Sequence, residues 1–76
     1  MKASTYKRMR MAMGLSQSEL AEIIGVTLNY VQKLESGERP ISELQNLKMM
    51  DLFTKRLKGN DELFSLIRDI LKHGES

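Results

Sequence analysis

The apolar residues of this chain recur at intervals of three and four, and nowhere do they alternate with polar residues over the length of a strand. This spacing predicts an all-α chain. Five glycines stand where the periodic segments stop, as expected of a residue that tolerates the left-handed conformation after a helix. The predicted helices span residues 5–13, 17–24, 28–36, 43–58 and 61–72.

Hydroxyl side chains mark where several of these helices start. Ser16 with Glu19, and Ser42 with Gln45, have the spacing of a capping box, in which each side chain accepts a hydrogen bond from a free backbone amide. Further N-cap candidates are Ser4 or Thr5, Thr27, and Asn60 or Asp61. Because the chain is short and its connections are brief, we expect one domain over residues 1–76.

The predicted core follows from the same spacing, since apolar residues at helical intervals share one face of a helix. The positions expected to be buried are Met9, Met13, Leu15, Leu20, Ile24, Val31, Leu34, Leu44 and Leu47.

Only Gly25, Val26 and Thr27 connect the second and third predicted helices, and such a short connection is typical of a helix-turn-helix. The small side chain of Ala21 lets the two helices cross closely. Gly25 can take a positive φ in the turn, and Val26 is expected to point inward. The sequence therefore predicts a helix-turn-helix over residues 17–36.

The third predicted helix has an outward face. Burial of its apolar stripe turns the opposite positions to the surface, at about 100° per residue. These positions hold Leu28, Asn29, Gln32, Lys33 and Ser36. Asparagine and glutamine can make paired hydrogen bonds to adenine, lysine can donate to guanine, and leucine can contact a thymine methyl group. The face therefore suits the major groove of DNA.

The run MGLSQSELAEIIGVTLNYVQKLESGERPIS resembles the helix-turn-helix of the Cro and lambda-repressor-like (XRE-type) superfamily of small phage, plasmid and bacterial repressors and antitoxins. The match covers about residues 6–50. Its most specific parts are the Gly-Leu-Ser-Gln-x-Glu-Leu-Ala run at 14–21, the Gly-Val-Thr turn at 25–27 and the Leu-Glu-x-Gly close at 34–37. The resemblance implies a five-helix DNA-binding domain with its helix-turn-helix at the second and third helices.

The resemblance also implies roles for single residues. Gln17 matches a glutamine that sits on the DNA backbone and braces a neighbouring recognition side chain, and Thr27 matches a residue that meets a phosphate. Arg10 and Glu35 match a partly buried salt bridge between the first and third helices. Arg39 is the best candidate for a phosphate contact in the loop after Gly37, which is less basic here than in many relatives. The positions that match contacts to base edges are Leu28, Asn29, Gln32 and Lys33.

Charge and composition limit the other classes. The net charge is +2, and residues 1–40 hold the whole surplus, because residues 41–76 carry six basic and six acidic side chains. With no cysteine and one histidine, neither a metal site nor a nucleophile–base pair is expected. We therefore expect no cofactor and no enzymatic activity. No apolar run is long enough to cross a membrane, so we expect a cytoplasmic protein.

The second half of the chain has more apolar residues than one small core can use. In the predicted helix over 61–72 they cover an arc of roughly 160°. We therefore expect residues 43–76 to form a symmetric homodimer, which would set two recognition helices about 34–36 Å apart and read an inverted repeat. The interface candidates are Met49, Met50, Phe53, Phe64, Ile67 and Leu71.

Two functional hypotheses follow. The first is a transcriptional repressor or autoregulator that occludes a promoter. The second is a protein-interaction factor, for example an antitoxin that neutralises a toxin and binds DNA secondarily, motivated by the apolar surplus after residue 41. The first is the leading hypothesis, because the helix-turn-helix motif carries it.

Overall fold

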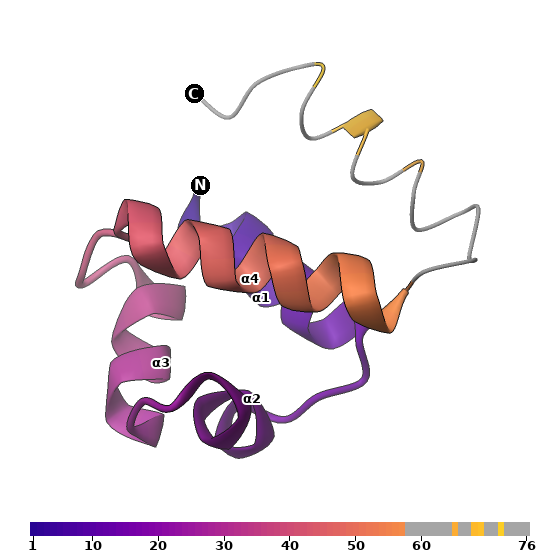
Figure 1. Ribbon diagram of the computed structural model, residues 1–76. Coiled ribbons are helices and arrows are strands. Elements are labelled where there is room, and N and C mark those ends of the chain that lie inside the picture. Colours follow the sequence, from indigo (N-terminus) through magenta and orange to yellow (C-terminus); the bar gives the residue numbers. More distant parts are fainter. Residues whose placement is uncertain (58–64, 66–67, 70–71, 73–76) are drawn as a thin grey trace.

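The computed structural model describes residues 1–57, 65, 68, 69 and 72 of the chain. Residues 1–57 form α1 (Ala3–Ala12), α2 (Gln17–Ile24), α3 (Leu28–Ser36) and α4 (Glu43–Arg56), without a strand (Figure 1). The predicted all-α architecture is thus confirmed for this part. Of the fifth predicted helix, over 61–72, the structure describes only residues 65, 68, 69 and 72. The helix ends expected at Gly59 and Gly74 and the cap expected at Asn60 or Asp61 lie outside the described residues.

The four helices pack around one core. In Figure 1, α4 lies across α1, α3 stands beside one end of this pair, and α2 is seen almost end-on below α4. The closest pairings are α2 with α3, α1 with α3, and α1 with α4. Helix α1 therefore packs against both the helix-turn-helix and α4.

The predicted bounds are correct for α2 and α3 and for the start of α4, and the other ends of α1 and α4 differ by one or two residues. Helix α1 begins at Ala3 after an extended Lys2 that makes no side-chain cap, so the expected cap at Ser4 or Thr5 is wrong. The earlier start adds a hydrogen bond from the Tyr6 amide to the Lys2 carbonyl, at 3.0 Å. Tyr6, in the first turns of α1, is fully buried in the core.

The capping box at the start of α2 is confirmed. The Ser16 hydroxyl accepts a hydrogen bond from the Glu19 amide at 3.0 Å, and a Glu19 carboxylate oxygen accepts one from the Ser16 amide at 2.9 Å. These bonds hold the pKa of Glu19 below its usual value. At the start of α4 only half of the box forms. The Ser42 hydroxyl accepts from the Gln45 amide, but the Gln45 side chain is buried instead of reaching back.

The core is formed by residues from all four helices and from the loop before α2. Its buried apolar members are Tyr6, Met9, Leu15, Leu20, Ala21, Val31, Leu34, Met49 and Phe53. Among the predicted core positions, Met13 and Ile24 pack partly buried against this cluster. Leu44 and Leu47 were expected to be buried, and this is wrong, because they are 59% and 58% exposed.

One rotation of α4 explains both this error and a second one. The helix turns Gln45, Met49 and Phe53 into the core, which places Leu44 and Leu47 on the opposite side. Met49 and Phe53 were predicted at a dimer interface, but they are 1% and 0% exposed within a single chain. Their side chains therefore pack in the core of a single chain and are not exposed for a contact with a second copy.

Of the four remaining interface candidates, the structure describes only Met50. Met50 is half-buried against the same core. Phe64, Ile67 and Leu71 lie outside the described residues. The structure thus moves any dimer contact of α4 away from its 45–49–53 stripe.

Candidate nucleic-acid interface

The turn between α2 and α3 has the geometry of a helix-turn-helix. Gly25 ends α2 in the left-handed conformation with φ 76°, and the Val26 amide donates to the Ala21 carbonyl at 2.9 Å. A Cβ on Gly25 would meet nothing within 4 Å, so glycine is favoured here by the backbone angle and not by crowding. Val26 packs half-buried against the core, as predicted, and Ala21 is 4% exposed.

The start of α3 combines a cap with free donors. The Thr27 hydroxyl accepts a hydrogen bond from the Tyr30 amide at 3.1 Å, and its own proton can still be donated. The amides of Leu28 and Asn29 belong to the first turn, where a helix has no internal acceptor. The exposed start of α3 therefore suits a phosphate oxygen.

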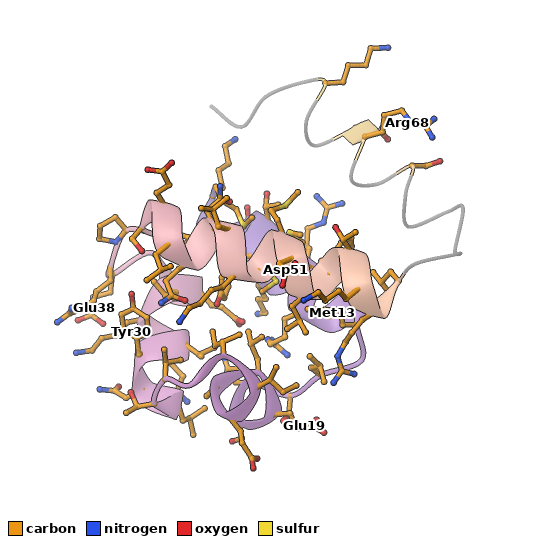
Figure 2. The ribbon with its side chains drawn as sticks, viewed as in Figure 1. Met13, Glu19, Tyr30, Glu38, Asp51 and Arg68 are labelled. Atoms are coloured by element: carbon orange, nitrogen blue, oxygen red, sulfur yellow. The ribbon has the colours of Figure 1, made fainter. Side chains whose placement is uncertain are left out.

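The two sides of α3 are clearly separated. Val31 and Leu34 are fully buried, whereas Leu28 is 41% exposed. Asn29 and Gln32 are exposed, and Lys33 is half-exposed. The predicted outward face is thus present, with its carboxamides and its ammonium group on the solvent side of α3. Tyr30, labelled in Figure 2, lies between the two sides and is half-buried against the core.

The back of α3 is held by a polar cluster that joins three helices. Arg10 on α1 donates from Nε and Nη2 to the two carboxylate oxygens of Glu35, at 2.7 and 3.1 Å. Its Nη1 donates to the Leu15 carbonyl at 2.8 Å. The predicted ion pair is therefore present, with the two side chains 10% and 3% exposed. Such a bidentate pair fixes the orientation of α3 as well as its position.

Gln17 completes this cluster. Its Nε2 donates to a Glu35 carboxylate oxygen at 3.1 Å, so Gln17 braces the ion pair. We call Arg10, Gln17 and Glu35 the three-helix clamp. The Gln17 side chain is only half-buried, because it stands at the first residue of α2.

The loop after α3 folds back on the end of that helix. Gly37 is left-handed, with φ 83°, and the Arg39 amide donates to the Lys33 carbonyl at 3.2 Å. The Ser36 hydroxyl donates to the same carbonyl at 3.1 Å. Arg39 is exposed next to an exposed Glu38, so the loop presents one charge of each sign.

Sequence reasoning missed two buried polar residues, Tyr6 and Gln45. The Tyr6 hydroxyl and the Gln45 side-chain oxygen are buried without a hydrogen-bond partner in the described part of the chain. Burial, and to a smaller extent the nearby Glu35 carboxylate, raise the pKa of Tyr6 to about 12. The i, i+3, i+4 spacing of Tyr6, Met9 and Arg10 within the predicted helix 5–13 was the signal that could have indicated this burial.

Among the described residues, no group of three or more His, Asp or Glu side chains is placed to hold a metal ion. No helix within residues 1–57 is long and apolar enough to cross a membrane.

Comparison with known proteins agrees with this geometry. A helix-turn-helix family model matches residues 7–53, which is more than half of the chain and includes α2, the turn, α3 and most of α4. No curated protein and no solved structure matches the chain. The chain belongs to the Cro and lambda-repressor-like (XRE-type) helix-turn-helix family, whose members are DNA-binding transcription regulators.

Proposed function

We propose that this chain is a dimeric repressor or autoregulator that binds a palindromic operator through the outward face of α3. The observation that carries the proposal is the contrast within α3. Its back is buried and fixed by the three-helix clamp, while Asn29 and Gln32 stand exposed on its front. A rigid helix with exposed hydrogen-bonding side chains meets the geometric need of base recognition.

The proposed contacts divide into two kinds. Leu28, Asn29, Gln32 and Lys33 would face base edges, where each good paired contact contributes about 1–3 kcal/mol of discrimination. Phosphate contacts would come from the elements that flank α3. These are the side-chain amide of Gln17, the Thr27 hydroxyl with the free backbone amides in the first turn of α3, and the Arg39 guanidinium.

The dimer would bind two half-sites. With two-fold symmetry its recognition helices enter successive major grooves about 34–36 Å apart, so the operator should be an inverted repeat. A protein of this kind would act by covering a promoter.

Selection of binding sequences from a random pool tests the proposal. We expect an inverted repeat, and we expect Gln32→Ala to weaken binding to it by about 1–3 kcal/mol while non-specific binding is unchanged. Glu38→Ala is the matched control, because Glu38 is exposed but lies outside α3. A selected pool without sequence preference, or equal effects of the two variants, would count against the proposal.

Salt dependence gives a second test. Neutralised phosphates release counterions, so log K should fall linearly with log salt, by about 0.9 for each phosphate contacted. Arg39→Met should reduce this slope by about one and weaken binding to all sequences alike. Affinity that does not respond to salt would contradict the assigned phosphate contacts.

The exposed Leu44 and Leu47 support a second candidate, an antitoxin-type factor that holds a protein partner and binds DNA secondarily. Leu44→Ser with Leu47→Ser distinguishes the two functions. The repressor hypothesis expects half-site binding by this variant to be unchanged. The second candidate expects a partner complex to be lost.

A further inference from the structure

A shallow groove lies where α2 meets α4. It is lined by Ile23, Ile24, Lys48, Asp51, Leu52 and Lys55. Ile23 is 43% exposed there, and the exposed Leu44 stands one turn of α4 before Lys48. An apolar floor with a charged rim is what the apolar face of an amphipathic helix requires. We call this surface the α2–α4 groove.

We propose that the α2–α4 groove receives residues 61–72 of a second copy of the chain, and that the two copies exchange these segments reciprocally. The inference rests on the homodimer of the proposed function and assigns its interface. It uses none of the outward residues of α3, so pairing and base recognition do not compete for a side chain.

Matching charges identify the occupant. Lys48 and Lys55 are seven residues apart, which places them on the same side of α4 and about 10 Å apart along its axis. Glu62 and Asp69 are also seven residues apart, at one edge of the apolar arc predicted for 61–72. A helix over 61–72 laid along α4 can therefore set one carboxylate beside each lysine.

Both lysines can form an ion pair with such a carboxylate. The Lys48 ammonium donates to the Ile24 carbonyl at 3.4 Å, which leaves two of its three donors for other acceptors. The Lys55 ammonium pairs with Asp51 at 3.0 Å, but both side chains of that pair are well exposed, at 73% and 64%. An exposed pair of this kind contributes little by itself and can be extended by a further carboxylate.

The homodimer of the proposed function favours a second copy over the chain's own segment. Reciprocal exchange fills both α2–α4 grooves and pairs two lysines with two carboxylates in each of them. The contacts that fill the grooves then also hold the two copies together.

Charge reversal tests the proposal in the full chain. Variant A carries Lys48→Glu with Lys55→Glu, and variant B carries Glu62→Lys with Asp69→Lys. Each variant alone opposes like charges, so we expect its dimer dissociation constant to rise at least about tenfold in sedimentation equilibrium. An equimolar mixture of A and B restores opposite charges at both grooves, so we expect heterodimers.

The controls separate pairing from folding and from DNA binding. Lys7→Glu with Arg8→Glu makes the same change of charge on exposed positions of α1 and should leave the dimer unchanged. Helical circular dichroism establishes that A and B are folded, and should either variant unfold, Ile23→Asn must weaken the dimer instead. Binding of A to a single half-site reports the proposed DNA recognition separately from pairing.

Three results would overturn the inference. They are a wild-type chain that is monomeric at micromolar concentration, variants A and B that pair as tightly as wild type, and monomeric variants whose mixture forms no heterodimer. The last result would mean that the segment packs on its own chain. Loss of half-site binding by the wild-type dimer would instead contradict the proposed function and leave the interface standing.

Discussion

The inner and outer faces of α3 belong to the same nine residues but are subject to opposite demands. The inner face buries Val31 and Leu34 and fixes Glu35 in the three-helix clamp. The outer face leaves Leu28, 41% exposed, and Gln32 to solvent. Substitutions on the inner face should therefore change the free energy of unfolding, whereas those on the outer face should change only the affinity for DNA. The following predictions test that separation, from the largest effect to the smallest.

Leu34→Ala should lower the free energy of unfolding by about 2–5 kcal/mol, because it removes a fully buried side chain and leaves a cavity. A chain of this size has little stability to lose, so part of the population should be unfolded at room temperature. Urea titration followed by circular dichroism measures the change. Leu28→Ala, at an exposed position six residues earlier, is the matched control and should change the free energy of unfolding by less than about 1 kcal/mol.

Glu35→Ala should lower the free energy of unfolding by about 3 kcal/mol, because it leaves the partly buried Arg10 guanidinium without its carboxylate partner. Glu38→Ala, three residues further along and exposed, should have little effect. Replacing both members of the pair, Arg10→Met with Glu35→Met, should recover much of the loss. If Glu35→Ala were as stable as wild type, the clamp would not be what holds the inner face.

Thr27 tests the boundary between the two faces, since its hydroxyl caps α3 and is also proposed to meet a phosphate. Thr27→Ala should lower the free energy of unfolding by about 1 kcal/mol and weaken DNA binding at all sequences. Thr27→Ser keeps the hydroxyl and should retain both properties. A loss of stability with unchanged DNA affinity would assign Thr27 to the inner face alone.

Tyr6→Phe should have the smallest effect at neutral pH. The Tyr6 hydroxyl is buried without a described partner, so its removal should leave the free energy of unfolding unchanged or raise it by up to about 1 kcal/mol. A fall in the free energy of unfolding of Tyr6→Phe would mean that the hydroxyl has a hydrogen-bond partner.

The same variant should alter the response to alkali. The folded-state pKa of Tyr6 is raised from 10.0 to about 12, so the neutral phenol is favoured in the fold. The part of the free energy of unfolding that comes from this pKa difference is fully present below pH 10 and is lost as the pH rises through about 12. Wild type should lose more stability than Tyr6→Phe between these values in urea titrations, and equal losses would contradict the assignment.

Local patterns were enough to predict the helix-turn-helix. The Ser16 box, the left-handed Gly25 and the burial of Val31 depend on neighbours within a few residues, so spacing alone gave α2 and α3 with correct bounds. The outward positions of α3 followed from its buried stripe by rotation. The Arg10–Glu35 pair was accessible only through the family resemblance, because its partners are 25 residues apart.

Spacing could not decide the orientation of α4. The sequence 43–56 has apolar residues around most of its circumference, so several faces fit a helical period equally well. Packing against α1 buries the stripe of Gln45, Met49 and Phe53, and this orientation of the helix exposes Leu44 and Leu47. A polar residue inside the stripe made the correct face look less apolar than the wrong one.

The sequence by itself thus determined which segments of residues 1–57 are helical, where α2 and α3 begin and end, and which side of α3 faces solvent. These features arise from short-range hydrogen bonds and periodicity. Only the tertiary structure decided which side of α4 is buried, that Gln17 braces Glu35, and that Tyr6 belongs to the core. Those outcomes depend on contacts between helices distant in sequence, where the shape of the partner, and not the local pattern, selects among faces of similar hydrophobicity.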